Sequence, residues 1–356
     1  MGEHGAKVLV SCGASGNSHV FSLLLLTYLK NQIMARILTG IQSSNIPHLG
    51  NILGAIAPAI ELSRDPANNS IYFIADLHSL TSLKDAEFIR ESRYAVAATW
   101  LAFGLDTDKN ILFQQSHVPE VCELTWYLSC FMSYHRLQLA HSFKDKSAAG
   151  ADVNTGLFTY PILMAADILM YDTNFVPVGK DQKQHVEYTR DLAEKINHFY
   201  QKEIFVVPHE KIDESVMTIP GIDGRKMSKS YNNFINIFLP EKELKKVVMS
   251  VVTDSTPLED PKNPDADNVF ALYNLIATKE QASSLREKYL AGGFGYGQSK
   301  KALFELIMER YKNERDNYAR LMGDRGLLDS ELKKGADKAR AISLSVLNRV
   351  RSTMGF

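Results

Sequence analysis

The sequence predicts an α/β fold in which a Rossmann-like parallel sheet precedes an all-helical domain. From Met34 to about Asn232, short apolar runs alternate with longer amphipathic stretches, a pattern typical of βαβ units. After Asn232, only stretches with helical periodicity follow. A chain of 356 residues is long enough for about two domains. We therefore expect a Rossmann-like domain at residues 34–232 and a helical domain at residues 233–356.

Four short apolar runs are expected to form the buried strands. They lie at residues 36–40, 71–75, 110–115 and 174–179. Helices are expected at 50–62 with a kink at Pro58, at 84–104, at 161–171 with Pro161 in the first turn, and at 181–200. Four further helices are expected at 241–252, 267–290, 299–322 and 330–350.

Residues 1–33 differ from the rest of the chain. They contain one apolar run that is too short to span a bilayer, and no small-residue cleavage pattern follows it. We expect this segment to be an extension outside the Rossmann-like fold. An added helix and a misassigned start are the alternatives, and the sequence leaves open whether the segment is native or serves targeting.

Composition argues against several kinds of site. The formal net charge is −1, so contact with nucleic acid or a membrane would need a local patch. The three cysteines, Cys12, Cys122 and Cys130, contain no Cys-x-x-Cys pair, which argues against a disulfide framework and a zinc or iron–sulfur site. We expect free thiols in a reducing cytoplasm, no membrane segment and no dedicated protein metal site.

The stretch GRKMSKSYNN at residues 224–233 places Lys226 and Lys229 on a short polar loop at the expected domain junction. A lysine pair in an arbitrary sequence is usually a solvated surface feature. The interpretation changes when the loop is considered together with a second segment near the start of the chain, GIQSSNIPHLGNILG at residues 40–54.

This second segment joins the first expected strand to the first expected helix, and parallel sheets bind ligands at the carboxyl ends of their strands. Gly50 would let a flat ring approach the backbone. The free N–H groups of the helix start near Asn51 would favour phosphate, and His48 adds a donor beside them. By itself, the His-Leu-Gly-Asn motif is equally compatible with an ordinary turn and cap.

PHLGN and KMSKS together resemble the two signatures of the class I aminoacyl-tRNA synthetases, in the right order. Further segments narrow the resemblance to the tryptophanyl-tRNA synthetases of bacteria and organelles: TGIQ, FIADLHSLT, FKDKSA, GLFTYPILMAADILMY and VPVGKDQKQHVEYTRDLAEKIN. The resemblance extends from about Met34 to the last residues. It implies a tryptophan–tRNA ligase (EC 6.1.1.2), which forms tryptophanyl-adenylate and pyrophosphate from L-tryptophan and ATP and then esterifies tRNA(Trp).

The resemblance also implies a tryptophan site. Indole offers one N–H donor and no acceptor, so Asp167 is expected to accept that N–H while Met164 packs on the ring. For Asp167 the alternative is a capping or salt-bridge role. The site is expected to comprise Gly40, His78, Tyr160, Met164, Asp167 and Gln182, with Tyr160 and Gln182 holding the ammonium group. For His78 a purely structural role remains the alternative.

The ATP site implied by the resemblance comprises Gln42, His48, Gly50, Asn51, Asp181, Lys226, Met227, Ser228 and Lys229. Lys226, Lys229 and Lys146 are expected to neutralise charge on the leaving pyrophosphate, and Gln42 to meet the α-phosphate. Asp181 would contact either the ribose hydroxyls or the substrate's amino group. We expect Mg²⁺ to bind through the ATP phosphates.

The reaction also demands contact with RNA. By resemblance, the helical domain should read the anticodon and the protein should be a homodimer. The 32 residues of 325–356 carry seven basic and three acidic residues, a local net charge of +4. The apolar stripe of Ile342, Val346 and Val350 predicts that this helix packs on one side, and the catalytic domain is one candidate for its partner. Its basic residues would then face RNA phosphates or solvent: Lys333, Lys334, Lys338, Arg340, Arg349 and Arg351.

Two alternatives to a tryptophan–tRNA ligase remain at this point. One is a tyrosine-specific relative, which amino-acid-dependent activation would reveal. The other is a non-catalytic RNA-binding paralogue, in which decay of the lysine motif would be usual, whereas KMSKS is intact here.

Overall fold

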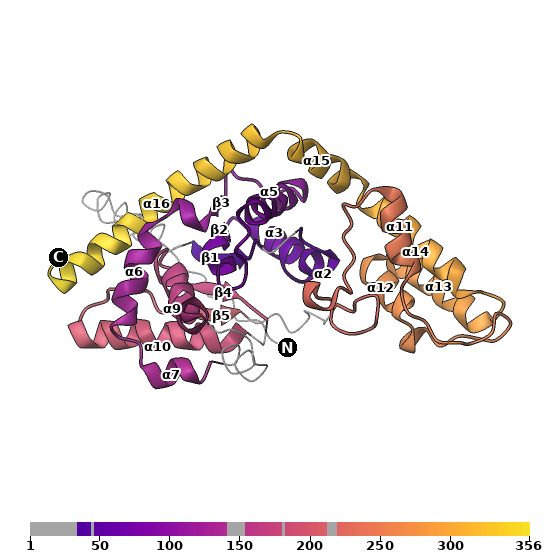
Figure 1. The fold of residues 1–356 in the computed structure, drawn as a ribbon, viewed down its shortest axis with the longest axis horizontal. Helices are drawn as coiled ribbons and strands as arrows, with labels where there is room; N and C mark the ends of the chain where they lie inside the picture. Colours follow the sequence, from indigo (N-terminus) through magenta and orange to yellow (C-terminus); the bar gives the residue numbers. More distant parts are fainter. Residues whose placement is uncertain (1–33, 44–45, 141–153, 180–181, 212–218) are drawn as a thin grey trace, which may run out of the picture. The chain divides into compact units, whose positions relative to one another are not determined.

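Five short parallel strands form the sheet at the centre of this computed structural model (Figure 1). They are β1 (Ala35–Ile41), β2 (Asn68–Ile74), β3 (Ile111–Gln114), β4 (Phe175–Pro177) and β5 (His209–Lys211). The strand order is β3-β2-β1-β4-β5, and the register pairs Gly40 with Phe73. The order changes direction between β1 and β4, and such a switch point is where open parallel sheets bind ligands.

The structure describes residues 34–43, 46–140, 154–179, 182–211 and 219–356. Within it, residues 35–356 form one compact unit. The expected extension at residues 1–33 and two expected site residues, Lys146 and Asp181, lie outside the described residues.

Helices connect and follow the strands. Those among the strands are α2 (Leu49–Asn51), the π-helix η1 (Ile52–Ile56), α3 (Ala57–Ser63), α4 (Asp76–Ser79), α5 (Ala86–Ala102), the 3-10 helix η2 (Gln115–His117), α6 (Glu120–Ser129), α7 (Tyr134–Gln138), α9 (Thr155–Leu169) and α10 (Lys183–Tyr200). Those after the strands are the 3-10 helices η4 (Lys229–Tyr231) and η5 (Pro264–Ala266), and α11 (Glu241–Met249), α12 (Asn268–Ile276), α13 (Lys279–Ala291), α14 (Tyr296–Arg310), α15 (Lys312–Met322) and α16 (Arg325–Met354).

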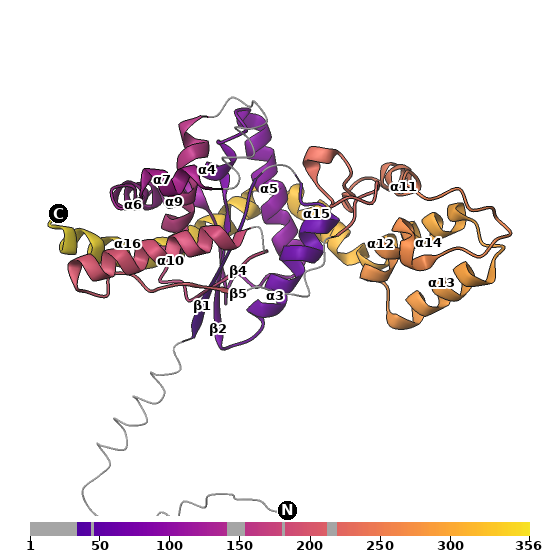
Figure 2. The same ribbon diagram turned by 90° about the horizontal axis from the view of Figure 1, so that it is seen from below.

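The alternation of side chains along the strands creates two cores, one on each face of the sheet. Tyr72 and Leu112 point into a cluster with α3 and α5, and this cluster continues into the helices after Glu241. Figure 2 shows α3 and α5 together on one side of the strands. Ile71 and Phe113 point into a second cluster with α6, α9 and α10. Because both faces are covered, residues 71–74 of β2 and 111–113 of β3 are apolar and buried, which is why these segments read as continuous apolar runs.

Helix α16 covers the edge strand β3, which would otherwise present unpaired backbone groups. The approach is close: a Cβ atom built on Gly335 would lie 1.7 Å from the carbonyl oxygen of Leu112. Val346 and Val350 are fully buried in the second cluster, and Ile342 packs against it. The predicted apolar stripe therefore does bury one face of this helix.

The basic residues of α16 have partners within the protein, and the expectation that they face RNA or solvent stays a prediction. Arg340 contacts Glu120, Arg349 contacts Asp172, Arg351 contacts Glu123 and Lys334 contacts Asp108. Lys338 donates to the carbonyl oxygens of Thr107 and Asp108 at 2.8 and 3.0 Å. Lys333 pairs with Asp337 on its own helix. These cations flank the apolar stripe, so packing α16 against β3 brings them to acidic and carbonyl groups of the sheet region.

Three other expectations differ from the structure. Pro161 lies inside α9, because Asn154 caps the helix earlier by accepting from the Leu157 N–H at 3.0 Å. The expected helix at 267–290 is two helices, since Thr278 and Gln281 form a capping box that starts α13. The expected helix at 299–322 is also two, α14 and α15, which meet at Tyr311. The sequence reading also missed β5.

The predicted Rossmann-like sheet with helices after it is confirmed. In the described part of the chain, none of the helices is both long enough and apolar enough to cross a membrane.

Candidate active site

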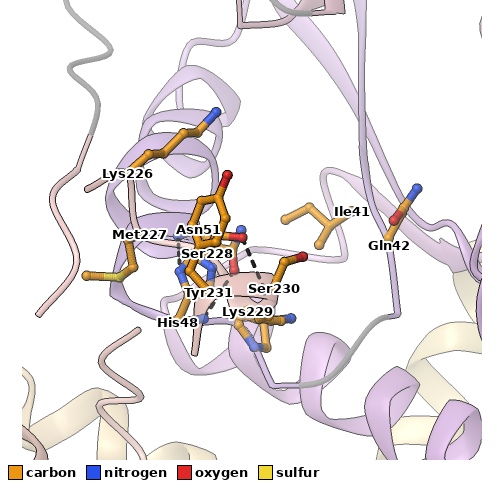
Figure 3. A pocket seen from close by; sticks show the side chains of 11 residues that line it. Ile41, Gln42, His48, Asn51, Lys226, Met227, Ser228, Lys229, Ser230 and Tyr231 are labelled. Carbon is orange, nitrogen blue, oxygen red and sulfur yellow. Dashed lines mark hydrogen bonds between the residues drawn. The ribbon is translucent and has the colours of Figure 1, made fainter. Parts of the chain in front are cut away.

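The two signature segments lie against each other in the fold. The backbone N–H of Gly50 donates to the sulfur of Met227 at 3.2 Å, and the N–H of Leu49 donates to the carbonyl oxygen of Ile235 at 2.8 Å. A cavity of about 600 Å³ opens beside this contact. It is lined by Ile41, Gln42, Pro47, His48, Asn51, Lys226, Met227, Ser228, Lys229, Ser230 and Tyr231 (Figure 3).

His48 starts α2 and is held by a reciprocal cap. Its Nδ1 accepts from the N–H of Asn51 at 3.2 Å, and its own N–H donates to Asn51 Oδ1 at 3.2 Å. Because Nδ1 accepts, the ring proton of the neutral form lies on Nε2. Burial, with the charge of Lys229 as a second cause, lowers the pKa of His48 to about 4. His48 is therefore a neutral donor at physiological pH.

The expectation of free N–H groups at this helix start is wrong. The N–H groups of Leu49, Gly50 and Asn51 bind Ile235, Met227 and His48, respectively. A phosphate at this cavity would thus contact side chains rather than these three N–H groups. The π-helix that follows α2 places Pro58 at the start of α3, so the expected irregularity in this helix takes the form of a π turn ahead of the proline.

The lysine segment is fixed by its neighbours. The N–H of Met227 donates to the carbonyl oxygen of Ile219 at 2.8 Å, and its side chain is 4% exposed. The buried Asn233 accepts from the N–H of Ser228 at 2.8 Å and donates to the carbonyl oxygen of Lys226 at 3.1 Å. Sequence reasoning did not single out Asn233, although it closes the quoted stretch GRKMSKSYNN.

The two signature lysines lie in different environments. Lys226 is exposed, whereas Lys229 is half-buried near His48. Figure 3 shows the Lys226 side chain at the upper left of the lining group, away from Lys229, which lies near Ser230 and His48. Burial lowers the pKa of Lys229 to about 8. An ammonium group with this pKa is kept charged by a nearby phosphate, because an opposite charge favours the charged form.

Two residues expected in the tryptophan site, His78 and Asp167, lie together beyond the carboxyl ends of β2 and β3. His78 on α4 contacts Asp167 on α9, with 2.8 Å between His78 Nε2 and Asp167 Oδ2. Gln115, which follows β3, donates from Nε2 to both Asp167 oxygens at 2.8 and 2.9 Å. Burial raises the pKa of Asp167, and the hydrogen bonds from His78 and Gln115 oppose this shift. Sequence reasoning missed Gln115, although it lies directly at the end of an expected strand.

Tyr160 extends this group. Its ring meets the His78 ring edge-on with centroids 6.3 Å apart, and its hydroxyl lies 2.8 Å from His185 Nε2. A second cavity of about 560 Å³ borders Tyr160 between α4, α6 and α9. Met164 is half-buried on the same helix, and Gln182 precedes α10 as its cap residue.

Gly40 has a structural reason to lack a side chain. A Cβ atom there would lie 2.5 Å from the ring of Phe73, its partner on β2. Any role in ligand binding would add to this packing requirement. In the described part of the chain, no group of three or more His, Cys, Asp and Glu side chains is arranged to hold a metal ion.

Comparison with known proteins agrees with this geometry. Residues 30–312 match the family model of the tRNA synthetases class I (W and Y). The chain belongs to this family. The tryptophan–tRNA ligase of Fusobacterium nucleatum is 47% identical over 322 residues, which cover 90% of this chain and 98% of that protein. The tryptophan–tRNA ligase of Rhodopirellula baltica is 46% identical, over 90% of this chain and 99% of that protein.

A solved structure is similar as well. The tryptophanyl-tRNA synthetase of Campylobacter jejuni, complexed with ADP and tryptophan, has a TM-score of 0.86 and 43% identity, over 90% of this chain and 100% of that chain. The resemblance stated from the sequence, the α/β fold and the tryptophan–tRNA ligase activity are thereby confirmed. The two alternative functions lose their support, since the similar proteins named here are tryptophan–tRNA ligases over nearly their whole length.

Proposed function

We propose that this chain joins L-tryptophan to tRNA(Trp) through an adenylate, with ATP bound between α2 and residues 226–231. One observation carries the proposal: the two signature segments meet through Gly50 and Met227 beside a polar cavity of about 600 Å³. Every described residue expected at the ATP site lies on or against this cavity: Gln42, His48, Gly50, Asn51, Lys226, Met227, Ser228 and Lys229.

In the first step the tryptophan carboxylate oxygen attacks the α-phosphorus of ATP, and the bond from that phosphorus to pyrophosphate breaks. The protein's contribution is to position the groups and stabilise charge. Lys229 is partly desolvated, so its attraction to the leaving phosphates is weakly screened. Lys226 meets the same phosphates from the exposed side, and Gln42 lies at the edge of the cavity where the α-phosphorus would be.

Tryptophan binds through Asp167, His78, Tyr160, Met164 and Gln182. Asp167 accepts the indole N–H, and Met164, three residues before it on α9, packs on the ring. The Tyr160 hydroxyl and the Gln182 carbonyl accept from the substrate ammonium group. Gly40, at the end of β1, lets the substrate approach the backbone at this site.

Two further assignments rest on resemblance alone. Lys146 adds a third positive charge for pyrophosphate, and Asp181 binds either the ribose hydroxyls or the amino group of tryptophan. Mg²⁺ enters as part of the ATP substrate, and its phosphate-bound waters suit a cavity lined by lysine and amide groups.

The second step requires tRNA(Trp). In this proposal residues 34–232 form the catalytic domain, and residues 233–356 supply the tRNA and anticodon contacts. The chain acts in the cytoplasm as a homodimer. Three large apolar side chains close together in the sequence support the dimer: Trp126, Tyr134 and Leu139 are 68, 62 and 55% exposed. Sedimentation of the wild type and of Trp126→Lys checks this, since a dimer contact there predicts a shift toward monomer in the variant.

ATP–pyrophosphate exchange with tryptophan or tyrosine tests the reaction. We expect exchange with tryptophan only, a loss of about a hundredfold or more in Lys229→Ala, and weaker tryptophan binding in Asp167→Ala. Lys279→Ala, an exposed lysine at the start of α13, is the matched control and should retain wild-type exchange. Exchange that is unchanged in Lys229→Ala would remove the proposed role of the cavity.

A further inference from the structure

Gln115 occupies a bridging position that the reaction described above does not yet use. It is 1% exposed and lies just beyond β3, between α4 and α9. Its Oε1 accepts from the backbone N–H of Leu77 at 3.1 Å. Its Nε2 donates to Asp167 Oδ1 at 2.8 Å and to Oδ2 at 2.9 Å. One side chain therefore ties the start of α4 to the carboxylate of α9.

These partners allow only one orientation of the amide. Leu77 offers a donor and an ionised Asp167 offers only acceptors. Rotating the amide by half a turn would set its oxygen against the carboxylate and its NH₂ against the Leu77 N–H, leaving two buried contacts repulsive. The NH₂ group of Gln115 is thus held toward Asp167 by the backbone rather than by the carboxylate alone.

The arrangement also determines which part of Asp167 is left for a ligand. A carboxylate has about four acceptor positions, two on each oxygen. Within the described residues, Oδ2 accepts from Gln115 and His78, and Oδ1 accepts from Gln115 only. One position on Oδ1 remains, and the carboxylate cannot rotate to offer another without breaking a contact to Gln115.

We propose that Gln115 is a positioning residue for amino-acid selection: it fixes Asp167 so that a single acceptor position is presented to the indole N–H. This inference rests on the proposed role of Asp167 and adds a residue that does not touch the substrate. The amide donor of Gln115 also favours the ionised form of the buried carboxylate and opposes the rise in pKa that burial causes. An acceptor that is both charged and fixed discriminates strongly between a substrate that donates and one that does not.

The test compares two substrates that differ at one atom. In ATP–pyrophosphate exchange, kcat/KM is measured for tryptophan and for 3-benzothienylalanine, in which sulfur replaces the indole N–H. Gln115→Met keeps the size of the side chain and removes the donor. We expect the preference for tryptophan to fall by about tenfold or more, through a higher KM for tryptophan and an almost unchanged kcat, since Gln115 is remote from the ATP cavity.

Gln114→Met is the matched control. Gln114 lies one residue earlier and donates to Asp76 at 2.6 Å, and within the described residues it makes no contact with Asp167. Its loss perturbs the same strand end and should lower both kcat/KM values by the same factor. Where Gln115→Met fails to fold, Gln115→Leu replaces it, because leucine likewise lacks a donor and carries no charge.

The outcomes separate this inference from the function beneath it. Absence of tryptophan-dependent exchange in the wild type would refute the proposed function itself. Loss of the preference in Asp167→Ala together with its retention in Gln115→Met or Gln115→Leu would overturn the role of Gln115 and leave the function standing. An equal fall in kcat/KM for both substrates in the Gln115 variants would likewise overturn this role, since a structural defect alone explains such a result.

Discussion

The backbone N–H of Gly50 donates to the sulfur of Met227 at 3.2 Å. This contact joins a residue of the first signature to a residue of the second and lies beside the cavity proposed to bind ATP. A Cβ atom on Gly50 would lie 3.0 Å from His48 Nδ1 and 3.3 Å from the Met227 sulfur. The neighbours would then have to shift by a few tenths of an ångström, so the geometry of the whole cavity depends on the missing side chain.

Gly50→Ala is therefore expected to impair activation more than folding. Displacing His48 and Met227 should raise KM for ATP and lower exchange by about ten- to a hundredfold, because reacting groups tolerate little misplacement. Steady-state exchange at varied ATP measures this. Gly297→Ala is the control, since a Cβ there meets open space. If Gly50→Ala exchanges like Gly297→Ala, the contact with Met227 does not shape the site.

The pKa of about 8 at Lys229 predicts a pH dependence of ATP capture. As pH rises through about 8, the free enzyme loses this ammonium charge, so kcat/KM for ATP should fall. Bound phosphates favour the charged form, so the fall in kcat should come at higher pH. Lys229→Arg stays charged throughout and should abolish the fall. A wild-type profile that stays flat to pH 9.5 would contradict this.

The lowered pKa of Lys229 also makes the free energy of unfolding depend on pH. This stability should rise with pH over the range in which kcat/KM for ATP falls. The folded-state pKa is below the unfolded value of 10.5, so the unfolded chain binds more protons between pH 8 and 10.5. The cost of burying the ammonium is fully present below pH 8 and is relieved as pH rises through this window. Urea unfolding of the wild type and Lys229→Met should show a stability difference that narrows from pH 7.5 to pH 10. A stability difference between the two proteins that stays constant with pH would mean that titration of Lys229 does not cause it.

Two glycines of α16 make a matched pair for stability. Gly335→Ala would drive a Cβ to within 1.7 Å of the Leu112 carbonyl oxygen, whereas the nearest atom to a Cβ on Gly326 is 3.5 Å away. We expect Gly335→Ala to cost about 3 kcal/mol or more of unfolding free energy, by overpacking. Gly326→Ala should stabilise slightly, as Gly→Ala usually does in a helix. Denaturant midpoints report both, and equal midpoints would mean that α16 does not rest on β3 in solution.

Arg349 distinguishes a structural cation from an RNA-facing one. It donates to the carbonyl oxygen of Ile204 at 2.6 Å and pairs with Asp172. Arg349→Ala should lower the melting temperature and leave the salt dependence of tRNA binding unchanged. A residue bound to phosphate would instead reduce the slope of log Kd against log salt by about 1. Lys333→Ala, whose partner lies on the same helix, is the control for stability.

Much of the fold was predictable because local patterns agreed with tertiary packing. The strands read as apolar runs since both faces of the sheet are buried. The failures have local causes. Pro161 was read as a helix start, but the cap at Asn154 begins α9 earlier. β5 has only three residues, exposed or half-buried, so it carries no apolar signal.

The site was predictable to the extent that its residues lie in the signatures. Lys226, Lys229, His48 and Gly50 are neighbours of one cavity in the structure. Gln115 was missed because its role depends on contact with Asp167, which is distant in sequence. Asn233 was missed because its contacts with Lys226 and Ser228 arise from the folded shape of the loop, which no periodic pattern in the sequence reveals. The charges of α16 could be counted from the sequence but their partners could not be predicted, since the acidic partners lie on α6 and in the loops before β3 and β4.

The packing of α16 against β3 has a consequence for how the protein is synthesised. Synthesis runs from the amino end, so β3 leaves the ribosome long before Gly335 and the rest of α16. Throughout that interval the nascent sheet has an open edge ready to pair with any extended peptide. Messages truncated before α16 should therefore give aggregates rather than partly active enzyme. A chaperone that shields an unpaired strand would be needed most while the last part of the chain is being translated.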